Sequence, residues 1–594
     1  MNRTLHNQPI HWKVATSLIF AAIVFLFWQF AYPAHLAYHE QFQLFLFDTD
    51  YLLDRIDEPG GVVNYISDFF IQFYYHSWVG ATILAVLFVF IQQLTWQVVR
   101  KQGVKEAYYP LSFLPIIAVW CYMCNENAML SYPIALICTL LAMIAYLRLK
   151  IPRQRIVYVA IVLPLLYWIA GSVHFILTLW MVAYELRITL RNRFLFQGIA
   201  IAMTYSLLAF AWPLLSSIFV HYSIGRLMTG LEYYRFCRDF PVTWYISLLI
   251  VSLTPILMPL LPEIKKRTKG IIALQIALIV ISGGWYIKSG CDFGKEEAIR
   301  YDRLAFRCQW EEIIERAEKK MPSTPQSVTC LNLALGMTGQ LSDRMFEFYQ
   351  NGPIGLIYPF SRNVVSSLCS SEVHYQLGMI NAAQQITFEV MASTPNNLQN
   401  ARCIRRLAET NLVNGQYEVA AKHLRTLQKT IYYKRWANHL MEFLYDETRI
   451  NNHPIYGRLR LIAQKDDYLY SGNEMTDMLS RLFHQNQKNQ LAFDYLMAHL
   501  LLTGDLQQVA NTLPLIQHTN YKQIPRTYQE ALTFAWAQNH TNFDSMPWNV
   551  SPNVKQAMTD FVKLYRTSTN NVQNLLKERY GKTYWYYITN RQQP

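Results

Sequence analysis

Long apolar runs fill roughly the first half of the chain, and a polar, amphipathic pattern replaces them after Lys288. A helix needs ~20 apolar residues to cross the hydrocarbon core of a bilayer. Most of the runs reach or approach that length, so the pattern predicts about nine membrane spans in a domain of residues 1–290. The predicted spans are Val14–Tyr32, Trp78–Val98, Pro110–Cys124, Ala128–Tyr146, Ile156–Ala170, Val173–Tyr184, Phe196–Phe219, Val242–Leu261 and Ile271–Ile287.

The second half, residues 291–594, has the spacing of amphipathic helices joined by short polar turns. In Cys308–Ala317, for example, apolar residues recur at the helical period, which indicates one buried face. Turns with similar surroundings follow at Gly339, Gly378, Gly415 and Gly504. Because the first three are spaced close to the ~34 residues of a tetratricopeptide repeat, residues 292–564 resemble a degenerate tetratricopeptide-like solenoid. The sequence therefore predicts an all-α protein, with a transmembrane helix bundle followed by a repeat domain that binds a partner.

Lys and Arg side chains divide the predicted loops into two groups. The N-terminal segment and one group of loops together hold sixteen Lys and Arg against three acids, which accounts for the net charge of +13. By the positive-inside rule these segments are cytoplasmic, so the N-terminus is predicted inside and the repeat domain outside. The rest of the chain is about neutral. The basic balance therefore reflects membrane topology, and no nucleic-acid partner is predicted.

The first outer loop, residues 33–77, is much longer than a connection between two spans requires. It holds seven acidic residues against the single cation Arg55. We expect two short helices in it, Tyr51–Ile56 and Val62–Tyr75, with a break at Pro59-Gly60-Gly61. The second helix is rich in aromatic residues, which favours a position in the bilayer interface. This loop is the best place in the sequence for chemistry.

Glu40 and the Asp48-Thr49-Asp50 triplet give this loop a layout that resembles the GT-C class of integral-membrane glycosyltransferases. In that class an acidic residue or pair follows the first span, and helices then lie along the membrane. The resemblance implies transfer of a sugar from a polyprenyl-phosphate-linked donor, with Glu40, Asp48 and Asp50 as catalytic residues. A carboxylate of this kind accepts the acceptor's proton or holds a divalent cation. The alternative is a solvated acidic loop in which Asp48 or Asp50 caps the following helix.

Two further outer features could complete such a site. The loop Val220–Phe240 holds Arg226, Arg235 and Arg238, and arginine binds phosphate with two parallel hydrogen bonds. Glu126 lies at the tip between the third and fourth predicted spans, where an acid is costly unless it is paired or hydrated. We predict these four residues as substrate-binding. Salt bridges to the acidic loop, and a simple polar turn, are the alternatives.

At nearly full length the chain is similar to an uncharacterised family of polytopic inner-membrane proteins of Bacteroidetes. That resemblance implies a multi-pass protein of the bacterial inner membrane with a periplasmic C-terminal domain, but it implies no activity. Two functions are predicted. The first is a GT-C-type glycosyltransferase with membrane lipids and a polyprenyl-phosphate-linked sugar as ligands. The second is a non-enzymatic scaffold whose repeats bind periplasmic proteins or glycans. A transporter is disfavoured because few ionisable residues lie deep in the predicted bundle.

Overall fold

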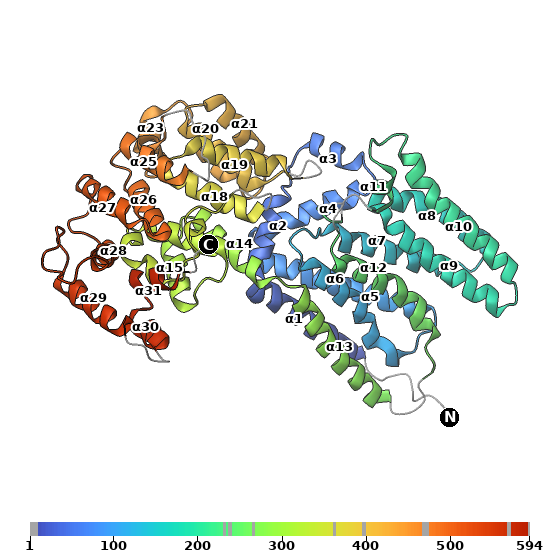
Figure 1. Ribbon diagram of the computed structural model, residues 1–594. Helices are drawn as coiled ribbons and strands as arrows, with labels where there is room; N and C mark the ends of the chain where they lie inside the picture. The colour runs from blue at the N-terminus through green and yellow to red at the C-terminus, as the bar shows by residue number, and fades with distance from the viewer. Residues whose placement is uncertain are drawn as a thin grey trace. The chain divides into compact units, whose positions relative to one another are not determined.

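The structure, a computed structural model, is all-α (Figure 1). It describes residues 10–229, 233–235, 240–263, 268–359, 364–394, 399–465, 474–566 and 572–591. In these residues the one feature of strand type is an isolated antiparallel bridge between Ala128 and Tyr234. The chain forms two compact units. The first contains Met1–Phe293, Thr394–Ala401 and Thr426–Arg435, and the second contains Gly294–Ser393, Arg402–Arg425 and Trp436–Pro594.

The first unit contains the apolar helices. They are α1 (Ile10–Leu26), α2 (Pro33–Phe42), α3 (Thr49–Ile56), α4 (Gly61–Ile71), α5 (Ser77–Lys101), α6 (Leu114–Met123), α7 (Ser131–Tyr146), α8 (Pro152–Ala170), α9 (His174–Arg191), α10 (Leu195–Ser216), α11 (Ile224–Thr229), α12 (Val242–Leu257) and α13 (Thr268–Gly290). Large apolar side chains such as Leu207 on α10 and Ile281 on α13 are exposed. In water a surface of this kind would be costly, so it indicates a membrane protein.

By length and composition, six described helical stretches are long and apolar enough to cross a membrane. They are Trp12–Ala31, Ser77–Lys101, Pro152–Arg191, Leu195–Ser216, Val242–Leu260 and Lys269–Gly290. The prediction of about nine spans is therefore confirmed only in part. One of the six, Pro152–Arg191, consists of α8 and α9, which fold back on each other at Gly171 (φ 75°). An ion pair between Arg155 and Glu185 (2.8 Å) joins the start of α8 to the second half of α9, so the two helices are antiparallel.

The predicted span Pro110–Cys124 is not a single α-helix. Its first part belongs to a 3-10 helix, Glu106–Phe113. Pro110 lies inside that segment and has no N–H to donate, which disfavours a continuous α-helix. The remaining helix, α6, has 10 residues and is almost entirely buried. At 1.5 Å per residue it spans ~15 Å, about half of a bilayer core.

Residues 33–77, which the sequence predicts as the first outer loop, contain three α-helices. The predicted helices and the break at Gly60 (φ 85°) are confirmed by α3, α4 and a 3-10 turn over Gln72–Tyr75. The helix that precedes them, α2, was not predicted. Pro33 occupies its first turn, where a missing N–H costs nothing. Eight of its ten residues are buried, so α2 is part of the core of the unit.

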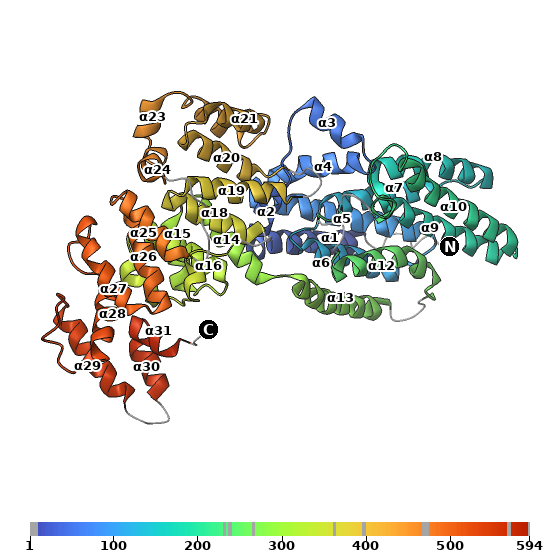
Figure 2. The ribbon, with the colours of Figure 1, turned by 45° about the horizontal axis from the view of Figure 1, so that its top comes forward.

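The second unit is built from shorter helices, many of them packed in consecutive pairs such as α18 with α19 and α25 with α26 (Figure 2). They are α14 (Phe293–Phe306), α15 (Trp310–Lys319), α16 (Pro325–Met337), α17 (Leu341–Arg344), α18 (Val364–Leu377), α19 (Ile380–Ala392), α20 (Ala401–Val413), α21 (Tyr417–Gln428), α22 (Lys434–Met441), α23 (Glu447–Asn452), α24 (Tyr456–Ile462), α25 (Met475–Gln485), α26 (Gln490–Thr503), α27 (Leu506–Thr512), α28 (Arg526–Ala537), α29 (Pro552–Tyr565), α30 (Val572–Tyr580) and α31 (Tyr584–Asn590).

The glycine turns expected in this half are present. Gly339, Gly378, Gly415 and Gly504 all have positive φ and follow the ends of α16, α18, α20 and α26. At Gly378 the requirement is also steric, because an added Cβ would lie 2.5 Å from the carbonyl oxygen of Ile462. These turns define helical hairpins, whereas the tetratricopeptide-like solenoid stays a prediction.

Candidate functional site

A buried polar cluster surrounds α2 at the end of the first membrane helix. His35 and His39, one turn apart on α2, have ring centroids 4.8 Å apart, and both are buried. Burial lowers the pKa of His35 to about 4, although the nearby Glu126 carboxylate acts in the opposite direction. Burial also lowers the pKa of His39, and the positive charge of Arg235 adds to that shift. Both imidazoles are therefore neutral at pH 7.

Arg235 lies within the same cluster. Its side chain is 1% exposed, and its Nη1 donates to the hydroxyl of Tyr38 on α2 (3.3 Å). The guanidinium also lies 4.5 Å from the centre of the Phe42 ring, a cation–π contact with the end of α2. An arginine buried this deeply is a fixed positive charge in a medium of low dielectric, where it acts strongly on any anion that approaches.

Backbone pairing brings the Arg235 segment to the turn that carries Glu126. The Arg235 N–H donates to the carbonyl of Asn127 (2.9 Å), and the Met129 N–H donates to that of Tyr233 (3.0 Å). The structure thus brings together Glu126, Arg235 and α2, and Arg235 and Tyr38 of α2 lie 197 positions apart in the sequence. The sequence had indicated Glu126 and Arg235 separately but not this pairing.

Glu40, also on α2, is buried and bonded to a late segment of the chain. The hydroxyl of Tyr433 lies 2.7 and 2.9 Å from the two carboxylate oxygens of Glu40. The neighbouring Tyr432 ring stacks on Tyr75 with centroids 4.6 Å apart and an interplanar angle of 9°. Residues 426–435, which we call the docked segment, belong to the first unit. Sequence reasoning missed this contact, although an apolar and aromatic run at residues 431–433 was a signal.

Asp48 is bonded to the same docked segment. Its carboxylate forms an ion pair with Lys429, and the hydrogen bond from this lysine, together with its positive charge, lowers the pKa of Asp48. The Phe47 N–H donates to the carbonyl of Lys429 (2.8 Å). Asp48 occupies the N-cap position of α3 without a capping hydrogen bond from its side chain. Asp50, in the first turn of α3, is exposed.

The other predicted arginines lie outside this cluster. Arg226, on α11, has its guanidinium 4.2 Å from the centre of the Tyr222 ring. The Tyr222 hydroxyl donates to Glu58 (2.7 Å), so this loop is tied to the first outer loop. Arg238 lies outside the described residues. Among the residues that the structure describes, no group of three or more His, Cys, Asp and Glu side chains is arranged to hold a metal ion.

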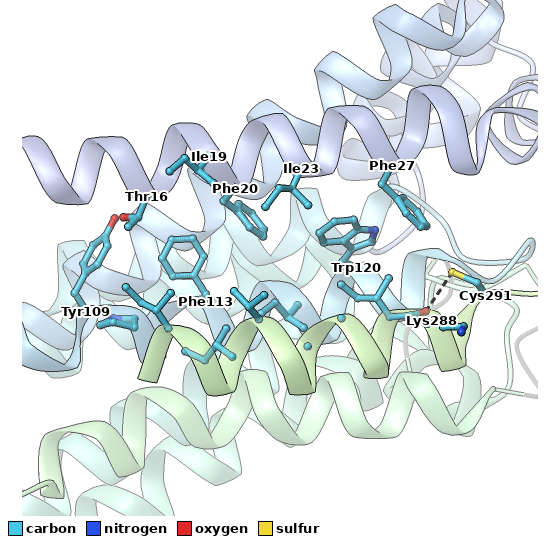
Figure 3. A pocket seen from close by; sticks show the side chains of 18 of the residues that line it. Thr16, Ile19, Phe20, Ile23, Phe27, Tyr109, Phe113, Trp120, Lys288 and Cys291 are labelled. Atoms are coloured by element: carbon cyan, nitrogen blue, oxygen red, sulfur yellow. Dashed lines mark hydrogen bonds between the residues drawn. The ribbon is translucent and has the colours of Figure 1, made fainter. Parts of the chain in front are cut away.

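An apolar groove of about 480 Å³ runs along α1 in the same unit. Figure 3 shows Phe20 and Ile23 of α1, and Phe27 just after its end, pointing into the groove, with Phe113 and Trp120 on its other wall. The groove runs from Trp12 on α1 to Phe27, about 22 Å at 1.5 Å per residue. That length and lining suit a single hydrocarbon chain. Its remaining wall is α13, which contributes Gly283, Gly284 and, at the end, Lys288.

The groove ends next to the histidine cluster. Phe27, which lines the groove, stacks on Tyr32 with centroids 5.7 Å apart. The Tyr32 ring in turn lies 4.8 Å from His35. The Asp292 N–H donates to the Tyr32 hydroxyl (3.0 Å), which fixes this ring at the end of α13. An apolar path along a membrane helix and a buried polar centre are therefore contiguous.

Comparison with protein-family models finds a match over nearly the whole chain. The family of unknown function DUF6057 matches residues 10–591. The chain belongs to this family. Comparisons with curated proteins and with solved structures found no match. The match extends over both units, so membership in DUF6057 includes the membrane helices as well as the helical hairpins.

Proposed function

We propose that this member of DUF6057 is an integral-membrane glycosyltransferase of the GT-C type. It would transfer a sugar from a polyprenyl-phosphate-linked donor to an acceptor outside the membrane. The observation that carries the proposal is the contact between groove and cluster, in which Phe27 touches Tyr32 and Tyr32 touches His35. A lipid-linked donor needs both parts, an apolar path for its chain and a polar centre for its headgroup.

Glu40 is the proposed base. After Tyr433 moves away, the Glu40 carboxylate accepts the proton of the acceptor hydroxyl, whose oxygen bonds to the anomeric carbon of the sugar. The bond between that carbon and the phosphate oxygen breaks, and its electron pair leaves with polyprenyl phosphate. The fixed charge of Arg235 stabilises the phosphate. Asp48 and Asp50, at the start of α3, are the alternative acids.

The proposed orientation follows from the same reaction. The acceptor is extracytoplasmic, so α2 faces the periplasm, the N-terminus is cytoplasmic, and about nine helices cross the inner membrane. The second unit is then a periplasmic, tetratricopeptide-like domain that presents the acceptor. Membrane lipids surround α10 and α13, whose apolar side chains are exposed.

Analysis of the envelope glycans of cells tests this function. A strain that lacks the chain should lose a sugar from its extracytoplasmic glycans, as measured by mass spectrometry. The wild-type gene should restore the sugar and Glu40→Gln should not, because loss of a general base costs roughly 10²–10⁴-fold in rate. Asp54→Asn is the matched control, since Asp54 is an exposed acid of the same loop. Unchanged glycans in the deletion strain, or restoration by Glu40→Gln, would refute the proposal.

A non-enzymatic scaffold is the second candidate, and the docked segment favours it. Tyr433 binds Glu40 and Lys429 binds Asp48, so both acids have a structural role in the described conformation. In this alternative the membrane helices are an anchor, and the second unit binds envelope proteins or glycans. Full-length protein should then capture a periplasmic partner equally well with Glu40→Gln as without it. A capture that depends on Glu40 would contradict the scaffold.

A further inference from the structure

The second unit contains a pocket of about 230 Å³ that lies entirely within that unit. Its walls are aromatic: Phe306, Tyr375, Trp436, Phe443 and Tyr456. The volume is below the roughly 300–1,000 Å³ of pockets for drug-sized ligands, so it suits a ligand with a single ring. Tyr456 is 5% exposed, and within the described part of the chain its hydroxyl makes no hydrogen bond.

The floor of the pocket is a buried network of charges. Arg406 donates a hydrogen bond to Glu372 (2.5 Å) and forms an ion pair with Glu409 (3.0 Å), and its guanidinium lies 3.6 Å from the centre of the Tyr375 ring. Nε of Arg405 donates to the other oxygen of Glu409 (3.1 Å). Burying several charges is expensive even when they are paired, so a network in a pocket is a candidate for function.

This network has more positive than negative charge. The terminal nitrogens of Arg405 donate to none of the described residues, and the guanidinium lies 4.6 Å from the centre of the Trp436 ring. Within the described ranges Arg458 donates to one residue, Gln376 of the pocket wall, at 3.1 and 2.5 Å. Burial lowers the pKa of Arg458, as expected for a cation without a carboxylate partner. Three arginines thus face two glutamates.

The backbone of the pocket is also strained at one point. Cys308, on the pocket wall, has φ 55°, a left-handed conformation that is uncommon for residues other than glycine. Strain of this kind costs of order 1–3 kcal/mol and concentrates at ligand sites. It is an observation independent of the charge balance, and it points to the same place.

We propose that this pocket binds the ring of an acidic sugar, with the sugar carboxylate on the free nitrogens of Arg405. A carboxylate matches the guanidinium fork and neutralises the excess positive charge. The aromatic walls would pack on the apolar face of the ring, and Tyr456 and Glu409, which also line the pocket, would form hydrogen bonds with its hydroxyl groups. The ligand class is therefore a uronic acid or a related sugar acid. This binding does not depend on the transfer reaction.

A ligand-observed NMR titration of the full chain in lipid nanodiscs tests the proposal. The probes are glucuronate, galacturonate and N-acetylneuraminate. The controls are glucose, a neutral sugar, and benzoate, an acid without a sugar ring. At least one sugar acid should bind saturably, and at least tenfold more tightly than glucose or benzoate. Arg405→Gln should weaken that binding at least tenfold, because a charge-assisted bond to the ligand is lost.

Arg316→Gln is the control, since Arg316 is a half-exposed arginine of the same unit that lies outside the pocket. It should leave binding unchanged. No saturable binding of any sugar acid, or equal affinity in Arg405→Gln, would overturn the proposal. Benzoate binding as tightly as the sugar acids would overturn the sugar assignment. Sugar-acid binding by a chain that transfers no sugar would leave this inference standing and refute only the transferase.

Discussion

Tyr433→Phe removes one hydroxyl from the contact between the docked segment and α2. That hydroxyl lies 2.7 and 2.9 Å from the oxygens of Glu40, a carboxylate that is 5% exposed. Hydrogen bonds to charged groups are worth roughly 1.5–3 kcal/mol, so we take about 2 kcal/mol for this one. Since 1.4 kcal/mol is a factor of ten, the equilibrium constant for local opening of the segment should rise by about 30-fold.

Hydrogen exchange of the full chain in nanodiscs measures this opening. The Phe47 N–H, which donates to the Lys429 carbonyl, should exchange about 30-fold faster in Tyr433→Phe than in the wild type. Tyr432→Phe is the matched control. The Tyr432 hydroxyl bonds to no described residue, and its ring stacking on Tyr75 is retained. Equal exchange in wild type and Tyr433→Phe, or equal acceleration in both variants, would refute the reasoning.

Three further results are expected. Gly284 lines the groove, and an added Cβ there meets nothing within 4 Å, so Gly284→Phe should fill the groove and reduce the amount of copurifying lipid measured by mass spectrometry. Gly270 has the same space on the same helix but does not line the groove, so Gly270→Phe should leave the amount of lipid unchanged. Burial raises the pKa of Asp494 to about 7 from 3.8. The contribution of protonated Asp494 to the free energy of unfolding is therefore complete below pH 3.8 and falls by roughly 4 kcal/mol as the pH rises to 7. Urea unfolding of Asp494→Asn should not show this pH dependence. The sulfurs of Cys330 and Cys369 lie 3.2 Å apart, so these two residues should form a disulfide if the second unit is extracytoplasmic. Mass spectrometry of a digest without reductant should then find the two peptides linked, and free thiols would contradict that location.

Local patterns were the reliable part of the sequence. The apolar spacing in Cys308–Ala317 predicted α15, and its apolar residues Trp310, Ile313, Ile314 and Ala317 are buried. The break at Pro59-Gly60-Gly61 separated α3 from α4 as expected, because glycine adopts the required left-handed backbone without strain. Each of these features depends on residues within one or two turns of helix, so a single sequence contains the information.

Helix length and long-range contacts were less predictable. An apolar run indicates burial, but burial inside a bundle and burial in lipid have the same composition, so the composition of Pro110–Cys124 did not reveal its division between a 3-10 helix and α6. The contact of Tyr433 with Glu40 joins residues 393 positions apart, and no periodicity encodes such a pair. The same holds for Arg235 and Asn127, which meet through backbone hydrogen bonds that any side chain permits. The candidate residues were therefore found one by one, and their grouping was not.

The docked segment also sets an order for biosynthesis. The first unit includes residues 426–435, yet its last apolar helix ends at Gly290. A ribosome that adds ~5–20 residues per second needs about 7–30 s to make the intervening stretch. During that interval the nascent chain has its apolar helices but neither Tyr433 for Glu40 nor Lys429 for Asp48. Membrane insertion of the helices and completion of the first unit are thus separate events. A chain that stops before residue 426 would never complete the first unit.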